Sequence, residues 1–172
     1  MANPMQEIKL DKLTINIGIG NNEDKLENAK ALLKKLTGRE AAYTRAKKRF
    51  PEFGIRKGQI IGTLVTLRNK QAQEFLKNAL EAANNTLGSK AVANNSVNFG
   101  IKEYIEFSGV KYDPKIGMLG LNVNASFARK GVRVETRKRR SSKVGVKHRS
   151  ITKEELREFL KKNFGARVGE AE

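Results

Sequence analysis

Two hydrophobic periods alternate along the first half of the chain. Over residues 13–19 every second residue is Leu or Ile, and the residues between them are polar or glycine. A period of two predicts a strand with one buried face. Over residues 26–36 the apolar positions recur at helical spacing, which predicts a helix. Asp24 and Glu27 form a candidate capping box at its start, and Gly38 is placed to end it.

The same two periods continue to the end of the chain. The residues between the elements are rich in Asn, Gly and Pro, which is typical of turns and loops, and residues 84–96 are predicted to be such a loop. Thr152 and Glu155 have the spacing of a capping box, and Gly165 is placed to end the helix that follows. The remaining predicted elements are strands at 41–44, 60–68, 97–107 (interrupted at Glu103) and 119–127, and helices at 72–83 and 152–164.

This order of elements predicts an α+β fold. Several strands are apolar on one face and polar on the other, which favours an antiparallel β-sheet with helices packed on one face and an open polar sheet surface. With 172 residues and no second pattern of composition, the chain is expected to be a single domain over residues 1–172.

Positive charge is concentrated in two segments. The net charge is +17, and 14 of these charges lie in residues 45–58, here called the basic loop, and residues 128–150, here called the basic segment. The basic loop carries six Lys or Arg and one Glu, and the basic segment carries ten and one. Such concentrated charge is costly unless a polyanion neutralises it, so nucleic acid is the expected partner.

Catalytic and cofactor interpretations find little support. The sequence has no Cys and one His, which excludes disulfides, cysteine-based zinc sites and a two-histidine metal site, so no metal or cofactor is expected. The glycines of residues 18–23 resemble a dinucleotide fingerprint, but Glu23 stands at the third glycine position and would repel a pyrophosphate. The sequence shows no signal peptide and no run of about 20 apolar residues, so we expect a soluble, cytosolic protein.

Two classes of function remain compatible with the sequence. The first is a structural RNA-binding protein, and the second is an RNA-processing or modifying enzyme that captures its substrate with the basic loops. The absence of a paired acid–base constellation in the sequence favours the first class. A third class, a DNA architectural protein, lacks a basic recognition helix, because the charge lies outside the predicted helices.

Two features suit RNA, and each has a simpler explanation. Phe50 and Phe53 follow a run of cations in the basic loop, where they either present an aromatic surface to RNA or fold inward as anchors. Polar residues on the predicted strands either read 2′-hydroxyls and base edges or form the solvated side of the sheet. These strand residues are Thr14, Asn16, Thr66 and Arg68.

Six motifs in order resemble one known family. They are KLTINIGIG, LTG at the end of the first helix, TRAKKRFPEFGIRKG, VTLR, NFGIKE and KVGVKHRSITKEE. Together they resemble the large-subunit ribosomal protein family, number five in bacterial and archaeal nomenclature, that binds 5S rRNA in the central protuberance. The basic tail from Arg137 resembles the archaeal and eukaryotic branch.

The resemblance implies a structural protein of the large subunit without enzymatic activity, cytoplasmic and ribosome-bound. Its implied partners are 5S rRNA, the large-subunit rRNA, P-site tRNA, neighbouring large-subunit proteins and a small-subunit head protein reached by an inter-subunit bridge. No membrane partner is implied.

The resemblance also assigns residues to these partners. Bacterial relatives commonly have Gln where this chain has Arg39, so a phosphate contact is expected there in place of an amide contact. The residues assigned to 5S rRNA are Thr14, Asn16, Arg39, Thr44, Lys47, Thr66 and Arg68. Those assigned to tRNA are Lys48, Arg49, Phe53, Gly54, Ile55, Arg56 and Lys57. Those assigned to rRNA are Arg137, Lys138, Arg139, Arg140, Lys143, Lys147, His148 and Arg149.

Overall fold

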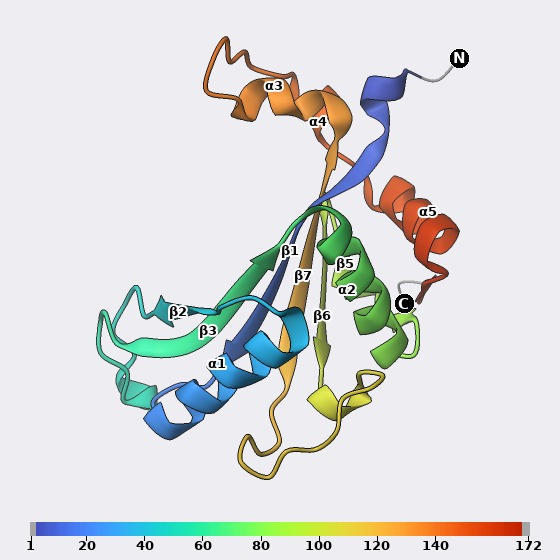
Figure 1. Cartoon of the computed structure of the whole chain (residues 1–172). Helices are drawn as coiled ribbons and strands as arrows, with labels where there is room; N and C mark the ends of the chain where they lie inside the picture. The colour runs from blue at the N-terminus through green and yellow to red at the C-terminus, as the bar shows by residue number, and fades with distance from the viewer. Residues whose placement is uncertain (1–2, 170–172) are drawn as a thin grey trace.

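A six-stranded antiparallel sheet forms the centre of the molecule (Figure 1). The computed structural model describes residues 3–169, apart from the side chains of Glu23 and Asp24. The strand order is β2-β3-β1-β7-β6-β5, so the first strand lies in the middle of the sheet. The strands are β1 (Ile8–Gly18), β2 (Ala42–Arg45), β3 (Ile60–Leu67), β5 (Val92–Ala93), β6 (Ser96–Ile101) and β7 (Leu121–Arg129).

Helices cover one face of this sheet. Figure 1 shows α1 (Glu23–Thr37) and α2 (Asn69–Ala82) on the same side, and α5 (Lys153–Phe164) beside them. The α+β prediction is therefore confirmed. Within residues 3–169 no helix combines the length and the apolar character needed to cross a bilayer. The shorter helical elements are α3 (Arg133–Thr136), α4 (Val146–Arg149), η1 (Pro4–Gln6), η2 (Pro51–Phe53), η3 (Ser89–Ala91), η4 (Tyr104–Glu106) and η5 (Lys130–Val132).

The core lies between the sheet and the helices. Strand register places Leu13 opposite both Leu67 and Ala125, and all three side chains are buried. Because side chains alternate between the two faces of a strand, the intervening residues of these strands face away from the helices. Leu33 of α1 and Leu76 of α2 belong to the same cluster. The apolar period in the sequence thus decided which face of each strand is buried.

The helix ends agree with the sequence at three of four predicted positions. Gly38 and Gly165 both have left-handed backbone at φ of 67° and 65°, and each donates its N–H to a carbonyl of the helix that it ends. Thr152 and Glu155 form the predicted capping box. The prediction for α1 is wrong, because the helix begins at Glu23 and Asp24 lies inside its first turn. Whether the Asp24 side chain bonds locally lies outside the described part of the structure.

The predicted strand at 97–107 is half right. β6 ends at Ile101, and residues Tyr104–Glu106 form a 3-10 turn. Tyr104 is fully buried, and its hydroxyl accepts a hydrogen bond from the backbone N–H of Asp113 at 2.9 Å. This buried tyrosine turns the chain away from the sheet, so Ile105 becomes partly exposed in spite of the alternating pattern.

The predicted loop at 84–96 also contains regular structure. β4 (Thr86–Leu87) pairs in parallel with β8 (Arg167–Val168), which follows α5. β5 pairs with the start of β6. Both pairs are two residues long, too short to produce a periodic signal in the sequence.

Candidate nucleic-acid interface

Polar side chains form rows across the sheet face opposite the helices. In one row Thr66, Thr14, Asn124 and Asn98 lie opposite one another on four successive strands. The next row contains Leu64, Asn16, Asn122 and Gly100. The prediction that Thr14, Asn16, Thr66 and Arg68 share a sheet face is confirmed for the first three, while Arg68 lies directly after β3, which ends at Leu67. We call the surface made by these two rows the open face.

The open face is suited to hydrogen bonding with RNA. Its hollow of about 300 Å³ is lined by Asn16, Asn98, Phe99, Gly100, Asn122 and Asn124. An amide both donates and accepts hydrogen bonds, so neighbouring asparagines can bind 2′-hydroxyls and base edges. A Cβ atom on Gly100 would lie 3.1 Å from Oδ1 of Asn122, so this glycine leaves space for that side chain.

Sequence reasoning missed three asparagines of this surface: Asn98, Asn122 and Asn124. Asn122 and Asn124 stood at the polar positions of a predicted strand, which was the available signal. Their proximity to Asn16 depends on β1 lying beside β7, a pairing between segments about a hundred residues apart. No local pattern specifies such a neighbour.

The other residues assigned to 5S rRNA are distributed around this face. Thr44 lies opposite Gly62, which in turn lies opposite Gly18, so it extends the open face toward the sheet edge. Arg39 donates from Nε to Oε1 of Gln71 at 3.0 Å, and it therefore contacts the helix layer. The remaining two are Lys47, exposed on the basic loop, and Arg68, exposed at the end of β3.

The basic loop is an ordered hairpin tip. Ala46 accepts from Gly58 and donates to Gln59, while Phe50 and Ile55 form a β-bridge around η2. The Gln59 side chain accepts from the Arg56 N–H at 2.9 Å and donates to Asn21 of the β1–α1 turn. These bonds tie the loop to the sheet edge.

The aromatic residues of the basic loop point outward. Phe50 and Phe53 are 47% and 69% exposed, so they are not the anchors of the loop. Ala46 and Ile55 are buried in their place. Ile55 is buried, and its backbone N–H and carbonyl both bond to Phe50, so it supports the loop and does not face a partner. The other residues assigned to tRNA are exposed: Lys48, Arg49, Phe53, Gly54, Arg56 and Lys57.

Arg129 joins the basic segment to the rest of the fold. Its guanidinium donates to the carbonyl of Gln6 at 3.0 Å, to that of Ser150 at 3.3 Å and to both carboxylate oxygens of Glu155. The pKa of Glu155 is lowered by the backbone N–H of Thr152, and Arg129 lowers it further while burial opposes both effects. One side chain thus connects η1, β7 and α5.

The basic segment forms a loop with a short helix near each end, α3 and α4, and contacts between its two limbs close it. Arg149 pairs with Glu135 at 2.9 Å, and Ser142 donates to the carbonyl of Val134. Arg137 donates from Nε to the carbonyl of Arg140 at 2.9 Å. Arg149, which was assigned to rRNA, is therefore partly neutralised. The other residues assigned to rRNA are exposed: Arg137, Lys138, Arg139, Arg140, Lys143, Lys147 and His148.

The two basic regions lie at opposite ends of the sheet. Figure 1 shows the basic loop beyond β2 and β3 at one end and α3 and α4 at the other. The open face extends between them. Within residues 3–169 no group of three His, Cys, Asp or Glu residues is arranged to hold a metal ion. Positive charge at both ends of the sheet and hydrogen-bonding side chains between them are suited to a polyanion partner.

Comparison with known proteins identifies the family. The model described as Ribosomal protein L5 matches residues 3–56, and the model of the C-terminus of the same ribosomal family matches residues 60–163. Large ribosomal subunit protein uL5 of Pyrobaculum aerophilum is 49% identical over 168 residues, which cover 97% of this chain and 93% of that protein.

Two further archaeal relatives bear the same name and align over almost their whole length. The protein of Sulfurisphaera tokodaii is 42% identical over 98% of this chain and 96% of its own. The protein of Nanoarchaeum equitans is 40% identical over 98% of this chain and 99% of its own. These relatives favour the structural RNA-binding class over the RNA-processing enzyme. The chain belongs to the ribosomal protein L5 family, whose role in the ribosome is structural and not enzymatic.

Proposed function

We propose that this chain is a structural protein of the large ribosomal subunit that binds 5S rRNA through its open face. The relatives are named as large-subunit proteins, and this supports the assignment to that subunit. The observation that carries the RNA assignment is the row of Thr66, Thr14, Asn124 and Asn98 across four strands. Hydroxyl and amide groups at this spacing can contact several consecutive nucleotides.

The two basic regions supply the charge for the other contacts. The basic segment binds large-subunit rRNA next to 5S rRNA and helps to attach the two. The basic loop extends toward P-site tRNA, and its exposed Phe50 and Phe53 with the cations around them support this role. Contacts with neighbouring large-subunit proteins and a bridge to a small-subunit head protein complete the proposal.

A titration of 5S rRNA against the full chain tests the central part of this proposal. If six to eight phosphates are neutralised, log affinity falls against log salt with a slope of about −5 to −7. Asn16→Ala with Thr66→Ala should reduce discrimination between 5S rRNA and an unrelated folded RNA, with the slope unchanged, because no charge is removed. Asn78→Ala, on the exposed side of α2, is the matched control.

Two results would contradict the proposal. One is equal affinity of the unmodified chain for 5S rRNA and the unrelated RNA at moderate salt. The other is an Asn16 and Thr66 variant that discriminates as well as the Asn78 control. Co-migration of the chain with large subunits in a sucrose gradient checks the assignment to the subunit independently.

A further inference from the structure

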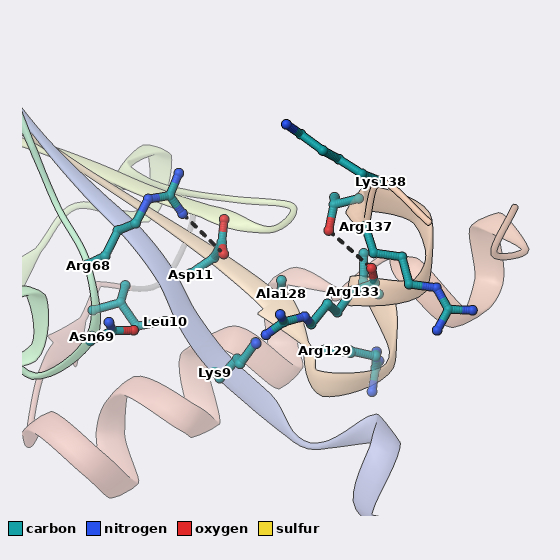
Figure 2. A pocket seen from close by; sticks show the side chains of 12 residues that line it. Lys9, Leu10, Asp11, Arg68, Asn69, Ala128, Arg129, Arg133, Arg137 and Lys138 are labelled. Carbon is teal, nitrogen blue, oxygen red and sulfur yellow. Dashed lines mark hydrogen bonds and ion pairs between the residues drawn. The ribbon is translucent and has the colours of Figure 1, made fainter. Parts of the chain in front are cut away.

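A basic groove lies where the open face meets the basic segment. It has a volume of about 530 Å³ and is walled by the first half of β1, the end of β7, the start of α2 and the α3 region. Figure 2 shows its lining from close by. Its charged side chains are Lys9, Asp11, Arg68, Arg129, Arg133, Arg137 and Lys138.

The groove holds more positive charge than its own contacts neutralise. Asp11 is the one carboxylate among its lining residues, and it pairs with Arg68 at 3.6 Å. Lys9 and Arg133 extend into the same space in Figure 2, with no carboxylate drawn between them. Two cations that share a space repel each other, so an anion bound between them would stabilise this arrangement.

Two of the arginines that line the groove are engaged elsewhere. Arg129 bonds to Glu155 and to backbone carbonyls, and Arg137 bonds to the carbonyl of Arg140. Within residues 3–169, Lys9, Arg133 and Lys138 have no hydrogen-bond or ion-pair partner for their side chains, while Arg68 is held by Asp11.

The floor of the groove continues the open face without a break. Lys9 lies opposite Ala128, and Lys12 lies opposite Ser126, on the same side of the sheet as Thr14 and Asn124. A bulge between Leu10 and Lys12 keeps these residues on one face. Ala128 has a short side chain, so the floor is low between the cationic walls. An RNA strand that crosses the two polar rows of the open face and continues past Thr14 would enter the groove.

We propose that this groove binds the sugar–phosphate backbone of the same 5S rRNA strand whose bases or riboses lie on the open face. The inference rests on the proposed function and deepens it. It adds Lys9 and Arg133 as phosphate-binding residues. It also places Arg68, which the resemblance assigned to 5S rRNA, and Lys138, which it assigned to rRNA, on one RNA strand.

The test uses isolated 5S rRNA as the only RNA and compares two triple variants of the full chain. Lys9→Gln, Arg133→Gln and Lys138→Gln remove three charges from the groove. Lys77→Gln, Lys111→Gln and Lys162→Gln remove three exposed charges outside it. The groove variant should bind about tenfold or more weakly at 0.1 M salt and have a salt slope less negative by about three, because about three phosphate contacts are lost. The control should change affinity much less.

A second variant is expected to raise the affinity for 5S rRNA. Asp11→Asn removes the groove's carboxylate and releases Arg68, so its affinity for 5S rRNA should rise several-fold. Glu81→Gln removes one exposed negative charge from the end of α2 and should have a smaller effect.

The outcomes separate this inference from the proposed function. If the unmodified chain does not prefer 5S rRNA, the proposed function itself fails. If it does, but the groove triple behaves like the control triple, the groove inference is overturned while the function stands. An Asp11→Asn variant whose affinity for 5S rRNA is no higher than that of Glu81→Gln would also overturn the groove inference. If the groove triple loses only a contact with a protein in assembled subunits, the inference is overturned in favour of an acidic protein segment as the occupant.

Discussion

The contacts of Arg129 predict that this one side chain stabilises the junction of the basic segment, the N-terminal segment and α5. Arg129→Met keeps most of the apolar stem but removes every hydrogen bond of the guanidinium. The side chain is only 14% exposed; its bonds to the Ser150 carbonyl are partly buried, and its bond to the Gln6 carbonyl is exposed. Each lost bond of this kind costs about 1 kcal/mol.

The ion pair adds a smaller contribution. The Glu155 side chain is 45% exposed, so its pairing with Arg129 contributes at most about 1 kcal/mol. The expected total loss is about 2–3 kcal/mol. For a protein of this size it corresponds to a fall in melting temperature of about 4–12 °C.

Urea unfolding followed by circular dichroism measures this loss. The midpoint should fall while the dependence on urea concentration stays constant, which marks a change in stability and not in the unfolded state. Arg133→Met is the control, because Arg133 is exposed and a surface substitution should change stability by less than about 0.5 kcal/mol. If Arg129→Met loses no more unfolding free energy than Arg133→Met, the stabilising role of Arg129 at this junction is refuted.

Three further predictions concern other parts of the fold. The pKa of Glu155 is lowered in the folded state, so its charged form adds stability above pH about 4.3, the unfolded value, and this stability is lost as pH falls through the lower folded pKa. The difference in unfolding free energy between the unmodified chain and Glu155→Gln, measured by urea titration, should therefore shrink toward zero in acid. A difference that stays constant with pH would contradict this prediction. Gly62→Ala should cost about 1–3 kcal/mol, because its Cβ would lie 2.4 Å from the carbonyl oxygen of Ile17, whereas Gly18→Ala, which meets nothing within 4 Å, should be tolerated in the same unfolding assay. Phe50→Ser with Phe53→Ser should leave stability and 5S rRNA binding unchanged but weaken P-site tRNA protection on reconstituted ribosomes; a loss of 5S rRNA binding would reverse the assignment of the basic loop.

Local sequence patterns determined the elements with the longest apolar periods. The alternation in β1 and β7 and the helical stripe of α2 each specify a buried face, because only one register places all their apolar residues in the core. The same alternation predicted which face of the sheet is polar. The helix ends at Gly38 and Gly165 and the capping box at Thr152 are also local signals, since each depends on a few consecutive residues.

Tertiary structure decided which of these elements meet. The asparagines of the open face come from β1, β6 and β7, and their rows exist because β1 pairs with β7 across about a hundred residues of chain. The inward position of Ile55 depends on its bridge to Phe50, and the closed course of the basic segment on contacts such as that of Arg149 with Glu135. Charge counting located the basic segment but could not separate Arg129, whose guanidinium bonds to Gln6, Ser150 and Glu155, from Arg133, whose guanidinium has no such partner within residues 3–169. That distinction depends on which carbonyls and carboxylates lie within hydrogen-bonding distance, and folding alone brings them there.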